Sequence, residues 1–262
     1  HESVTETEDS LLAIARVQGA KVLIQAADDK DKLLTDLDGD ILTTDGLAIR
    51  CAQLTHVNAL ALRKALPWTA PVSLRERRTT IGCGDRLGCA TPGHLRAAKR
   101  FDVAPVLAQQ SIRELTLTGR TYENVVDDVT FLVLQEGYRG GYGADGDHLK
   151  TLADINTAVD AGMAMITLDL TEKMNAKAET WSDAEVNTAF ASLPGQRQKR
   201  VIDTYGDRTF DLNGASVTMS TLEAKRCAVM YLPAMDFAAE VYALLRQRRG
   251  HAFDLEISID ET

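Results

Sequence analysis

The sequence predicts a parallel α/β fold, and three observations support that class. From Thr79 onward, short β-rich runs alternate with polar loops and helix-period segments, which is the pattern of βα units. The predicted strands end in polar side chains, as strands of α/β enzymes do at their ligand-binding edge. With 262 residues and 45% hydrophobic content, the chain can bury a substantial core.

Two N-terminal segments precede these units. Residues 1–10 are acidic and polar, and we expect them to be flexible. Residues 11–70 predict a small α/β domain, with strands at 21–27 and 47–54 and a helix that ends before Pro67. In this domain "DLDGDILTTDGL" has the aspartate spacing of a calcium loop. Because Ile41 replaces the required glycine and Leu47 the bidentate acid, we expect no calcium there.

Residues 71–262 form the predicted β/α portion. Its strands are expected at 79–85, 104–110, 141–147, 164–170 and 253–260. One intervening helix starts at Thr121 and stops at Gly137, and another starts at Thr151 and stops at Gly162, because threonine is a frequent N-cap and glycine a frequent terminator.

A helical insertion is predicted at 171–249, because this segment is too long for one crossover connection. Ser182 and Ser220 are each followed three residues later by glutamate, which is the capping-box pattern of a helix start. Five βα units cannot close an eight-stranded barrel, so the β/α portion is expected to be incomplete at its C-terminus.

Composition excludes several classes of partner. Lysine and arginine total 29 against 38 acidic residues, so the net charge of -9 provides no basic surface for nucleic acid or anionic lipid. The four cysteines form no C-x-x-C pair and suggest reduced thiols. No long apolar run or signal-peptide pattern is present in the sequence given. We therefore expect a cytoplasmic protein with neither a nucleic-acid nor a membrane partner.

The stretch "GGYGADGDHLK" satisfies the G-x-G-x-x-G fingerprint of a dinucleotide site. That interpretation requires a strand directly before the glycines, whereas "VVDDVTFLVLQEG" has the period of a helix. The carboxylates of Asp145 and Asp147 would also repel a pyrophosphate. We expect no NAD.

The alternative interpretation of the same stretch is a metal site at the carboxyl end of a strand. Asp147 and His148 supply an oxygen and a nitrogen, which suit zinc, manganese, cobalt or nickel. Adjacent residues on a regular strand point to opposite faces, so both could reach one ion only if the strand turns there. We expect Gly143 and Gly146 to permit such a turn.

The last predicted strand also carries a polar face. Asp254, Glu256, Ser258 and Asp260 alternate with apolar residues, so their side chains share one side of the strand. An exposed edge strand would show the same alternation. If the face instead lines a barrel interior, its polar groups need a metal or a substrate as partners.

Several long motifs occur in order along the chain: "GCGDRLGCATPGHLRAA", "VLAQQSIRE", "TGRT", "EGYRGGYGADGDHLKT" and "DLEISIDET". With these motifs the sequence resembles the tagaturonate epimerase family, also called fructuronate/tagaturonate epimerases. The resemblance implies a metal-dependent (β/α)8 TIM-barrel-like enzyme that interconverts D-tagaturonate and D-fructuronate in hexuronate catabolism.

Members of that family continue beyond the position of "DET", so the resemblance covers only their N-terminal part. The chain alone is accordingly expected to be inactive, and either to self-associate or to pair with a complementing C-terminal part. A catalytically silent chain that needs such a partner is one alternative function. A sugar aldolase or ketose isomerase with the same metal site is another, because polarising a ketone serves all three reactions.

The predicted roles follow from position at the strand ends. The small-molecule sugar acid would epimerise by retro-aldol and aldol steps or by metal-stabilised proton chemistry. The predicted residues are Asp147 and His148 as metal ligands, Asp85 and Glu256 as acid/base groups, and Gln110, Arg113 and Lys150 as substrate-binding groups.

Overall fold

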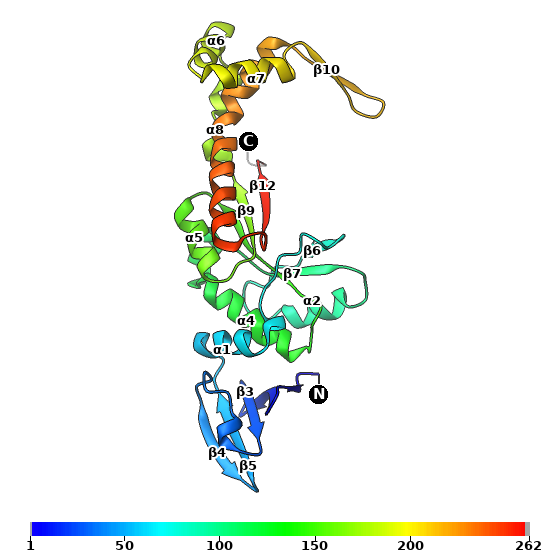
Figure 1. Ribbon diagram of the computed structural model, residues 1–262, viewed down its shortest axis with the longest axis vertical. Coiled ribbons are helices and arrows are strands. Elements are labelled where there is room, and N and C mark those ends of the chain that lie inside the picture. Colours follow the sequence, from blue (N-terminus) through cyan, green and yellow to red (C-terminus); the bar gives the residue numbers. More distant parts are fainter. Residues whose placement is uncertain (1, 260–262) are drawn as a thin grey trace. The chain divides into compact units, whose positions relative to one another are not determined.

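The computed structural model describes residues 2–259 (Figure 1). The chain forms two compact units. The first comprises His1–Thr167 with Arg249–Glu256, and the second comprises Leu168–Arg248 with Ile257–Thr262.

The first unit begins with a five-stranded antiparallel sheet. Its order is β1 (Thr5–Glu6), β2 (Leu11–Val17), β3 (Ala20–Ala27), β5 (Leu47–Ala52) and β4 (Asp40–Thr44). The strands predicted at 21–27 and 47–54 correspond to β3 and β5, and the predicted helix is α1 (His56–Ala65). Within the segment expected to be flexible, β1 pairs with β2, and Ser3 is buried.

The calcium-like stretch forms a β-hairpin. Strand β4 pairs with β5 in antiparallel register, and the connection has positive φ at both Asp45 (48°) and Gly46 (78°). An Asp-Gly pair with two positive φ values is typical of the tight turns that match strand twist. The Asp-Gly pair of this stretch therefore forms the tight turn that connects β4 to β5.

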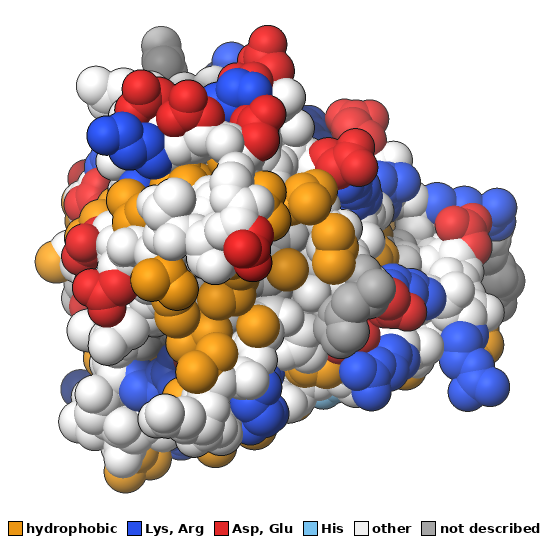
Figure 2. All heavy atoms as spheres, turned by 90° about the horizontal axis from the view of Figure 1, so that it is seen from below, with side chains coloured by type: hydrophobic (Ala, Val, Ile, Leu, Met, Phe, Trp, Pro, Cys, Tyr) orange, Lys and Arg blue, Asp and Glu red, His pale blue; other side chains and the backbone are white. Residues whose placement is uncertain are grey.

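Strand β4 also leaves apolar side chains in solvent. All five of its residues are exposed, including Ile41 and Leu42, and so are Leu47 on the neighbouring β5 and Leu11 on β2 of the same sheet. Figure 2 views the molecule from the end at which Figure 1 shows β4 and β5, and hydrophobic side chains are visible there among charged ones.

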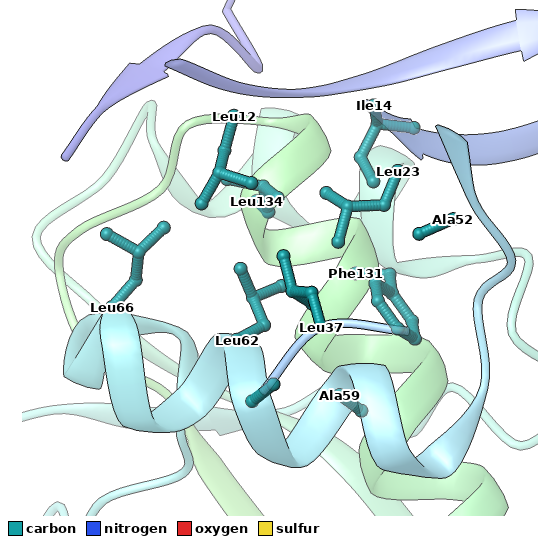
Figure 3. Packing of buried hydrophobic residues seen from close by; sticks show 11 residues of the cluster. Leu12, Ile14, Leu23, Leu37, Ala52, Ala59, Leu62, Leu66, Phe131 and Leu134 are labelled. Carbon is teal, nitrogen blue, oxygen red and sulfur yellow. The ribbon is translucent and has the colours of Figure 1, made fainter. Parts of the chain in front are cut away.

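One hydrophobic cluster joins the antiparallel sheet to two helices (Figure 3). Leu12 and Leu23 from the sheet, Leu62 from α1, and Phe131 and Leu134 from α4 (Tyr122–Gln135) are all buried in it. Burial of a leucine or phenylalanine side chain contributes about 1.5–3 kcal/mol. The antiparallel sheet is thus packed onto the helix that covers the parallel sheet.

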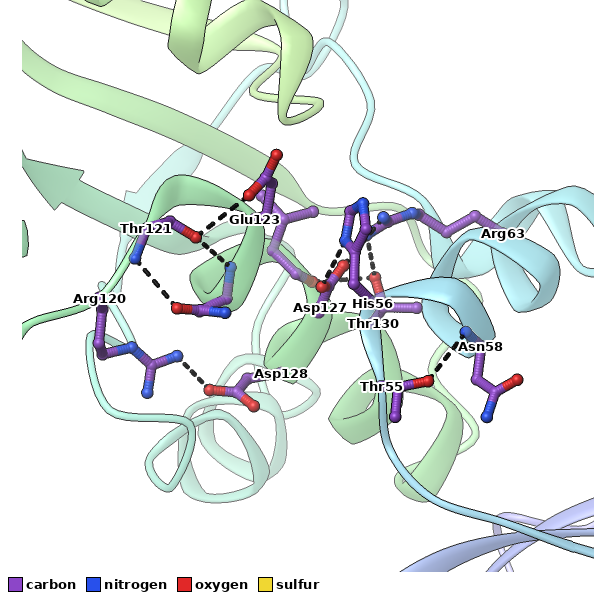
Figure 4. A network of polar contacts seen from close by, with 12 residues as sticks. Thr55, His56, Asn58, Arg63, Arg120, Thr121, Glu123, Asp127, Asp128 and Thr130 are labelled. Carbon is purple, nitrogen blue, oxygen red and sulfur yellow. Dashed lines mark hydrogen bonds and ion pairs between the residues drawn. The ribbon is translucent and has the colours of Figure 1, made fainter. Parts of the chain in front are cut away.

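A polar network supports the same junction (Figure 4). Asp127 on α4 accepts a hydrogen bond from Arg63 at 2.9 Å and lies 2.8 Å from His56 Nδ1, while Arg63 also donates to Thr130. Burial raises the pKa of Asp127, although His56 and Arg63 act in the opposite direction. Because the carboxylate of Asp127 is buried but paired, the network fixes α1 against α4.

The parallel sheet has the order β12 (Asp254–Ser258), β9 (Met165–Asp169), β8 (Gly143–Leu149), β7 (Ala104–Ser111) and β6 (Thr80–Gly82). It forms a half-barrel, and all five strands coincide with predicted ones. The chain therefore has an α/β fold, as predicted. The helices connecting these strands are α2 (Thr91–Ala98), α3 (Ile112–Thr118), α4 and α5 (Leu152–Asp160).

The predicted helix boundaries are confirmed. The Thr121 and Thr151 side chains each accept a hydrogen bond from the backbone three residues on, at the starts of α4 and α5. Gly137 has φ +57° and Gly162 φ +102°, a left-handed conformation that glycine adopts without a Cβ penalty.

The second unit is mostly helical. It contains the short helices Thr171–Lys173 and Ala176–Glu179, then α6 (Asp183–Ala191), α7 (Gly195–Tyr205) and α8 (Thr221–Arg249). Ser182 and Ser220 cap α6 and α8 together with Glu185 and Glu223, as predicted. A hairpin of β10 (Arg208–Asp211) and β11 (Ser216–Met219), which was not predicted, lies between α7 and α8.

Helix α8 is long and apolar enough, by length and composition, to cross a membrane. Its Ala224, Ala228 and Val229 are buried in a cluster with Phe190 and Val201 of the neighbouring helices. A core helix of a folded unit passes the same test of composition, and in α8 33% of the apolar window is buried inside the described chain.

Candidate active site

The carboxyl-terminal ends of β7 and β8 bring four polar residues onto one face of the parallel sheet. In the parallel register Gln109 lies beside Asp145, and Ser111 lies beside Asp147. Neighbouring residues of paired strands point to the same side, and residues two apart on one strand do so as well. Gln109, Ser111, Asp145 and Asp147 therefore form one patch, which we call the polar face.

Asp145 is the buried centre of the polar face, with 2% of its surface exposed. The Thr167 hydroxyl on β9 lies 3.1 Å from both carboxylate oxygens, and Gln109 Nε2 lies 3.5 Å from one of them. Burial, together with the charges of Asp147 and Glu256, raises the pKa of Asp145 to about 7, against the lowering effect of Thr167. A carboxyl group with this pKa can either hold or release a proton near neutral pH.

Asp147 and His148 lie together at the end of β8. His148 Nδ1 is 2.8 Å from Asp147 Oδ1, and His148 has φ +55°. The left-handed backbone of His148 turns its ring back toward the preceding residue, which a regular strand would not allow. Strand β8 continues to Leu149, so the strand does not end at this pair as predicted, and the change of backbone direction lies within it at His148.

The predicted cause of that turn was wrong. Neither Gly143 nor Gly146 is among the residues with positive φ. A Cβ on Gly143 would lie 3.0 Å from Val106, and one on Gly146 would lie 3.0 Å from Ala158. These glycines instead permit close packing of β8 against its neighbours, and His148 itself provides the turn.

The same geometry bears on the dinucleotide fingerprint. Its glycines lead into β8 and lie within it, whereas a dinucleotide cradle needs glycines that follow a strand and open a helix. The segment before them is α4, as the period of "VVDDVTFLVLQEG" predicted. The described residues therefore do not place this fingerprint in the context that its function requires.

Gln110 on β7 was predicted to bind substrate. It lies on the face of the parallel sheet opposite to Asp145 of β8. It pairs with Gly146, whose Cβ direction meets Ala158 of α5 and Ile166 of β9. Gln110 is fully buried, and neither side-chain amide atom has a hydrogen-bond partner among the residues described. Its neighbour Gln109 is the glutamine that reaches the polar face, so the geometry favours Gln109 for contact with a ligand.

Asp85, predicted as an acid/base group, organises the loop before α2. Its two oxygens accept hydrogen bonds from the backbone N–H groups of residues 87, 89, 90 and 91 and from the Thr91 hydroxyl, at 2.7–3.3 Å. Although burial raises it, these hydrogen bonds bring the pKa of Asp85 below its usual value. A carboxylate with both oxygens occupied is a poor proton acceptor, so the geometry favours a structural role for Asp85.

The final strand brings Glu256 toward the polar face. Its charge is among the causes of the raised pKa of Asp145, which indicates proximity, and its side chain is exposed. Asp254 has a structural contact, because it accepts hydrogen bonds from Ser73 Oγ (2.6 Å) and the Leu74 backbone (2.7 Å). Asp260, predicted in the same polar file, lies outside the described residues.

The two predicted cations differ in surroundings. Arg113 is exposed on α3 and makes no ion pair with the described residues, because Glu114 caps α3 with Ser111 and pairs with Arg86 at 3.1 Å. Lys150 follows β8 directly and is half-buried. Lys150 is therefore the predicted cation nearer in sequence to the Asp147–His148 pair, from which Leu149 separates it.

For a metal ion the polar face offers an incomplete set of ligands. Within residues 2–259, no group of three or more histidine, cysteine or acidic residues is arranged to hold a metal. His148 and Asp147 still provide a nitrogen and an oxygen donor 2.8 Å apart. Metal-binding histidines usually donate their second ring nitrogen to a carboxylate, and this pair has that arrangement.

No predicted site role fell on Asp145, Gln109 or Thr167, although the sequence places Asp145 and Gln109 near strand ends. A detectable signal was present, since side chains alternate along a strand with period two. If Asp147 faces the site, Asp145 must face it as well. The partner strands could not be aligned in this way, because register between β7 and β8 includes a bulge between Val106 and Ala108.

The fold and the polar face define a class: an α/β protein with acidic, histidine and amide groups at the carboxyl ends of parallel strands, which is where enzymes of parallel β/α architecture place their active sites. Comparison specifies the family. A family model described as "UxaE: tagaturonate epimerase" matches residues 1–262, and the chain belongs to that family.

Two relatives agree with this assignment. The tagaturonate/fructuronate epimerase of Thermotoga maritima is 34% identical over 218 residues, which cover 83% of this chain and 44% of that protein. The native crystal structure of fructuronate-tagaturonate epimerase UxaE from Cohnella laeviribosi superimposes with a TM-score of 0.89 at 38% identity, covering 100% of this chain and 52% of that one. A glycerol complex of the same enzyme gives the same values. The chain spans about half the length of these relatives.

Proposed function

We propose that this chain supplies part of the active site of an enzyme that interconverts D-tagaturonate and D-fructuronate. The observation that carries the proposal is the polar face, in which a buried acid, a carboxylate–histidine pair and an amide lie together on strand ends. Membership of the family supports the substrate, since both named relatives are tagaturonate/fructuronate epimerases. The half-barrel would be one side of a complete (β/α)8 barrel.

The chemistry has to invert the carbon that is β to the ketone, whose hydrogen is not acidic. Retro-aldol cleavage solves this problem. A base removes the proton from the hydroxyl on that carbon, the carbon–carbon bond to the α carbon breaks to give an aldehyde and an enediolate, and the bond re-forms on the other aldehyde face. The proton then returns to the hydroxyl, so no oxidant or co-reactant is consumed.

Within the described residues we assign the metal-directed role to His148. Because Asp147 lies against Nδ1, Nε2 is the nitrogen that a divalent metal would bind, and Asp147 would orient the ring. This revises the predicted role of Asp147 from ligand to positioning residue. When bound, the ion would polarise the ketone as a Lewis acid.

The remaining roles follow from placement. Asp145 lies at the centre of the polar face and is the described carboxyl group best placed to accept the hydroxyl proton, with Glu256 nearby. Gln109 is positioned to contact substrate hydroxyls. Lys150 and Arg113 are the cations proposed for the substrate carboxylate. The free thiols of the four cysteines are compatible with a reducing, cytoplasmic location.

The test uses the full-length protein with D-tagaturonate as substrate. We expect His148→Ala to lower bound metal, measured by mass spectrometry, and epimerase activity together. Asp147→Asn should weaken metal affinity about 10–100-fold, with activity recovering in excess metal. His251→Ala is the matched control, because His251 is exposed in the same unit.

The outcomes separate the alternatives. Full metal content and activity in His148→Ala would contradict the assignment of the metal to this residue. If the enzyme cleaved the substrate and released both fragments in place of the epimer, the activity would be that of an aldolase. Activity that depends on added nicotinamide cofactor would contradict the retro-aldol mechanism.

A further inference from the structure

The side chain of Gln109 lies between Asp145 and the loop that connects β6 to α2. Its Nε2 is 3.5 Å from Asp145 Oδ2, at the long end of hydrogen-bond range. Its Oε1 is 3.0 Å from the position that a Cβ on Gly84 would occupy, and 3.9 Å from the corresponding position on Gly82. Because 3.0 Å is tighter than ordinary van der Waals contact, the Gln109 amide uses space that only glycine at position 84 leaves free.

The loop is fixed to β7 and cannot move away from the Gln109 side chain. The backbone N–H groups of residues 83–85 donate to the carbonyl groups of Val106 and Leu107, at 2.6–3.3 Å. Gly84 itself has φ +44°. The backbone of Gln109 is also fixed, by the register of β7 with β8. A methyl group at position 84 would therefore be accommodated by the flexible end of the Gln109 side chain.

The Gln109 amide still has capacity for a ligand. Its Oε1 accepts no hydrogen bond from any described residue, and Gln109 is only half-buried. An amide also has a second N–H besides the one directed at Asp145. This oxygen and this N–H suit the hydroxyl groups of a sugar acid, which both donate and accept hydrogen bonds.

We propose that Gly84 is a positioning residue for the epimerisation, because its missing side chain sets where the Gln109 amide lies on the polar face. A methyl group at position 84 would cover Oε1 and displace the amide by a few tenths of an ångström. The inference rests on the proposed function, in which Gln109 contacts the substrate hydroxyls. Gly84 acts only through Gln109 and does not itself touch the substrate.

The first test measures kcat/KM of the metal-replete, full-length enzyme with D-tagaturonate. We expect Gly84→Ala to lower it at least about tenfold, because small displacements of positioning groups are costly. Gly119→Ala is the control for backbone strain, since Gly119 has φ +63° and its Cβ would meet nothing within 4 Å. Gly82→Ala is the control for size, since its methyl group would make an ordinary contact with Oε1. Both controls should keep wild-type kcat/KM.

A double substitution separates positioning from a general structural defect. If Gly84 acts through Gln109, Gly84→Ala should change kcat/KM by less than about twofold in a Gln109→Ala background. An equal further loss in that background would overturn the inference, because the methyl group would then act on something other than the Gln109 amide.

A spectroscopic test follows the amide without reference to activity. In full-length protein labelled with ¹⁵N-glutamine, the side-chain resonance of Gln109 is the one lost in Gln109→Ala. We expect it to shift in Gly84→Ala and to stay in place in Gly119→Ala. An unshifted resonance, or wild-type kcat/KM in Gly84→Ala, would overturn the inference and leave the proposed function intact. Full activity of Gln109→Ala would instead contradict the role of Gln109 in the proposed function, and the inference would then fail even if the resonance shifted.

Discussion

Two buried aspartates in the first unit have opposite surroundings. Asp85 is 1% exposed and accepts five hydrogen bonds from the loop that follows it, which lower its pKa. Asp145 is 2% exposed, but Asp147 and Glu256 are close to it, and its pKa rises to about 7. The loop stabilises the charge of one carboxylate, and the polar face disfavours the charge of the other. Burial alone therefore does not distinguish a structural aspartate from a functional one, whereas the number of donors does.

The backbone conformation also differs between the loop around Asp85 and the polar face. In the loop around Asp85, positive φ angles occur at Gly84 (44°) and Gly88 (70°), where a left-handed conformation has no Cβ penalty. At the polar face the positive φ falls on His148 (55°). Strain at a non-glycine residue beside an unfavourable charge is typical of a site selected for chemistry.

The largest expected effect is on Asp85. Asp85→Ala would leave five donors without an acceptor, two of them buried, and we expect the free energy of unfolding to fall by about 3 kcal/mol. Urea denaturation followed by circular dichroism measures the change. Asp102→Ala, at an exposed aspartate, should change stability by less than about 0.5 kcal/mol. A loss for Asp85→Ala as small as the control would remove its structural role.

For Asp145 we expect a substitution to change the free energy of unfolding in the opposite direction. In EDTA at pH 8, Asp145→Asn should raise the free energy of unfolding by about 2 kcal/mol, because it removes a buried charge beside Asp147 and Glu256 and keeps an acceptor for Thr167. In the metal-replete full-length enzyme, the same variant should lower epimerase activity at least about 100-fold. Stability gained while activity is lost marks a functional group. A destabilised or fully active variant would show that Asp145 resembles Asp85.

The fold was largely predictable because its signals are local. The five parallel strands and the caps at Thr121, Thr151, Ser182 and Ser220 depend on short patterns of residues. The β10–β11 hairpin also had a local signal that was overlooked, since Asn213 and Gly214 both have positive φ in its two-residue turn.

The site was less predictable, because it depends on register and face. Gln109 and Gln110 are chemically equivalent in the sequence, and only the pairing of β7 with β8 determines which one meets Asp145. The five donors to Asp85 are mainly backbone groups, which carry no signal in residue identity. A polar residue at a strand end therefore predicts the edge where a site lies, and not the role of each side chain.

The pH dependence of stability gives a further test of the structural role of Asp85. Its folded-state pKa is lowered, so its contribution is present above the unfolded-state pKa of about 3.9 and is lost as pH falls through the folded-state value. The stability difference between wild type and Asp85→Asn should therefore be constant from pH 7 to 5. It should shrink below about pH 4, by on the order of 1 kcal/mol. Urea midpoints measured across this range check the sign, and a difference that grows on acidification would contradict it.

The smallest expected effect separates backbone strain from chemistry at His148. Both His148→Gly and His148→Ala remove the contact with Asp147, but only glycine adopts φ +55° without a Cβ penalty. We expect the glycine variant to be the more stable by about 1 kcal/mol, although glycine inside a strand normally costs about 0.5–1 kcal/mol relative to alanine. Thermal unfolding of the two proteins in EDTA measures the difference. The reverse order is expected at Gly195, whose Cβ direction is open and whose φ is not positive, so Gly195→Ala should stabilise α7. Equal stability of the two His148 variants would mean that the turn at the end of β8 relaxes when the imidazole is removed, and that the ring, more than the chain around it, holds the left-handed backbone in place.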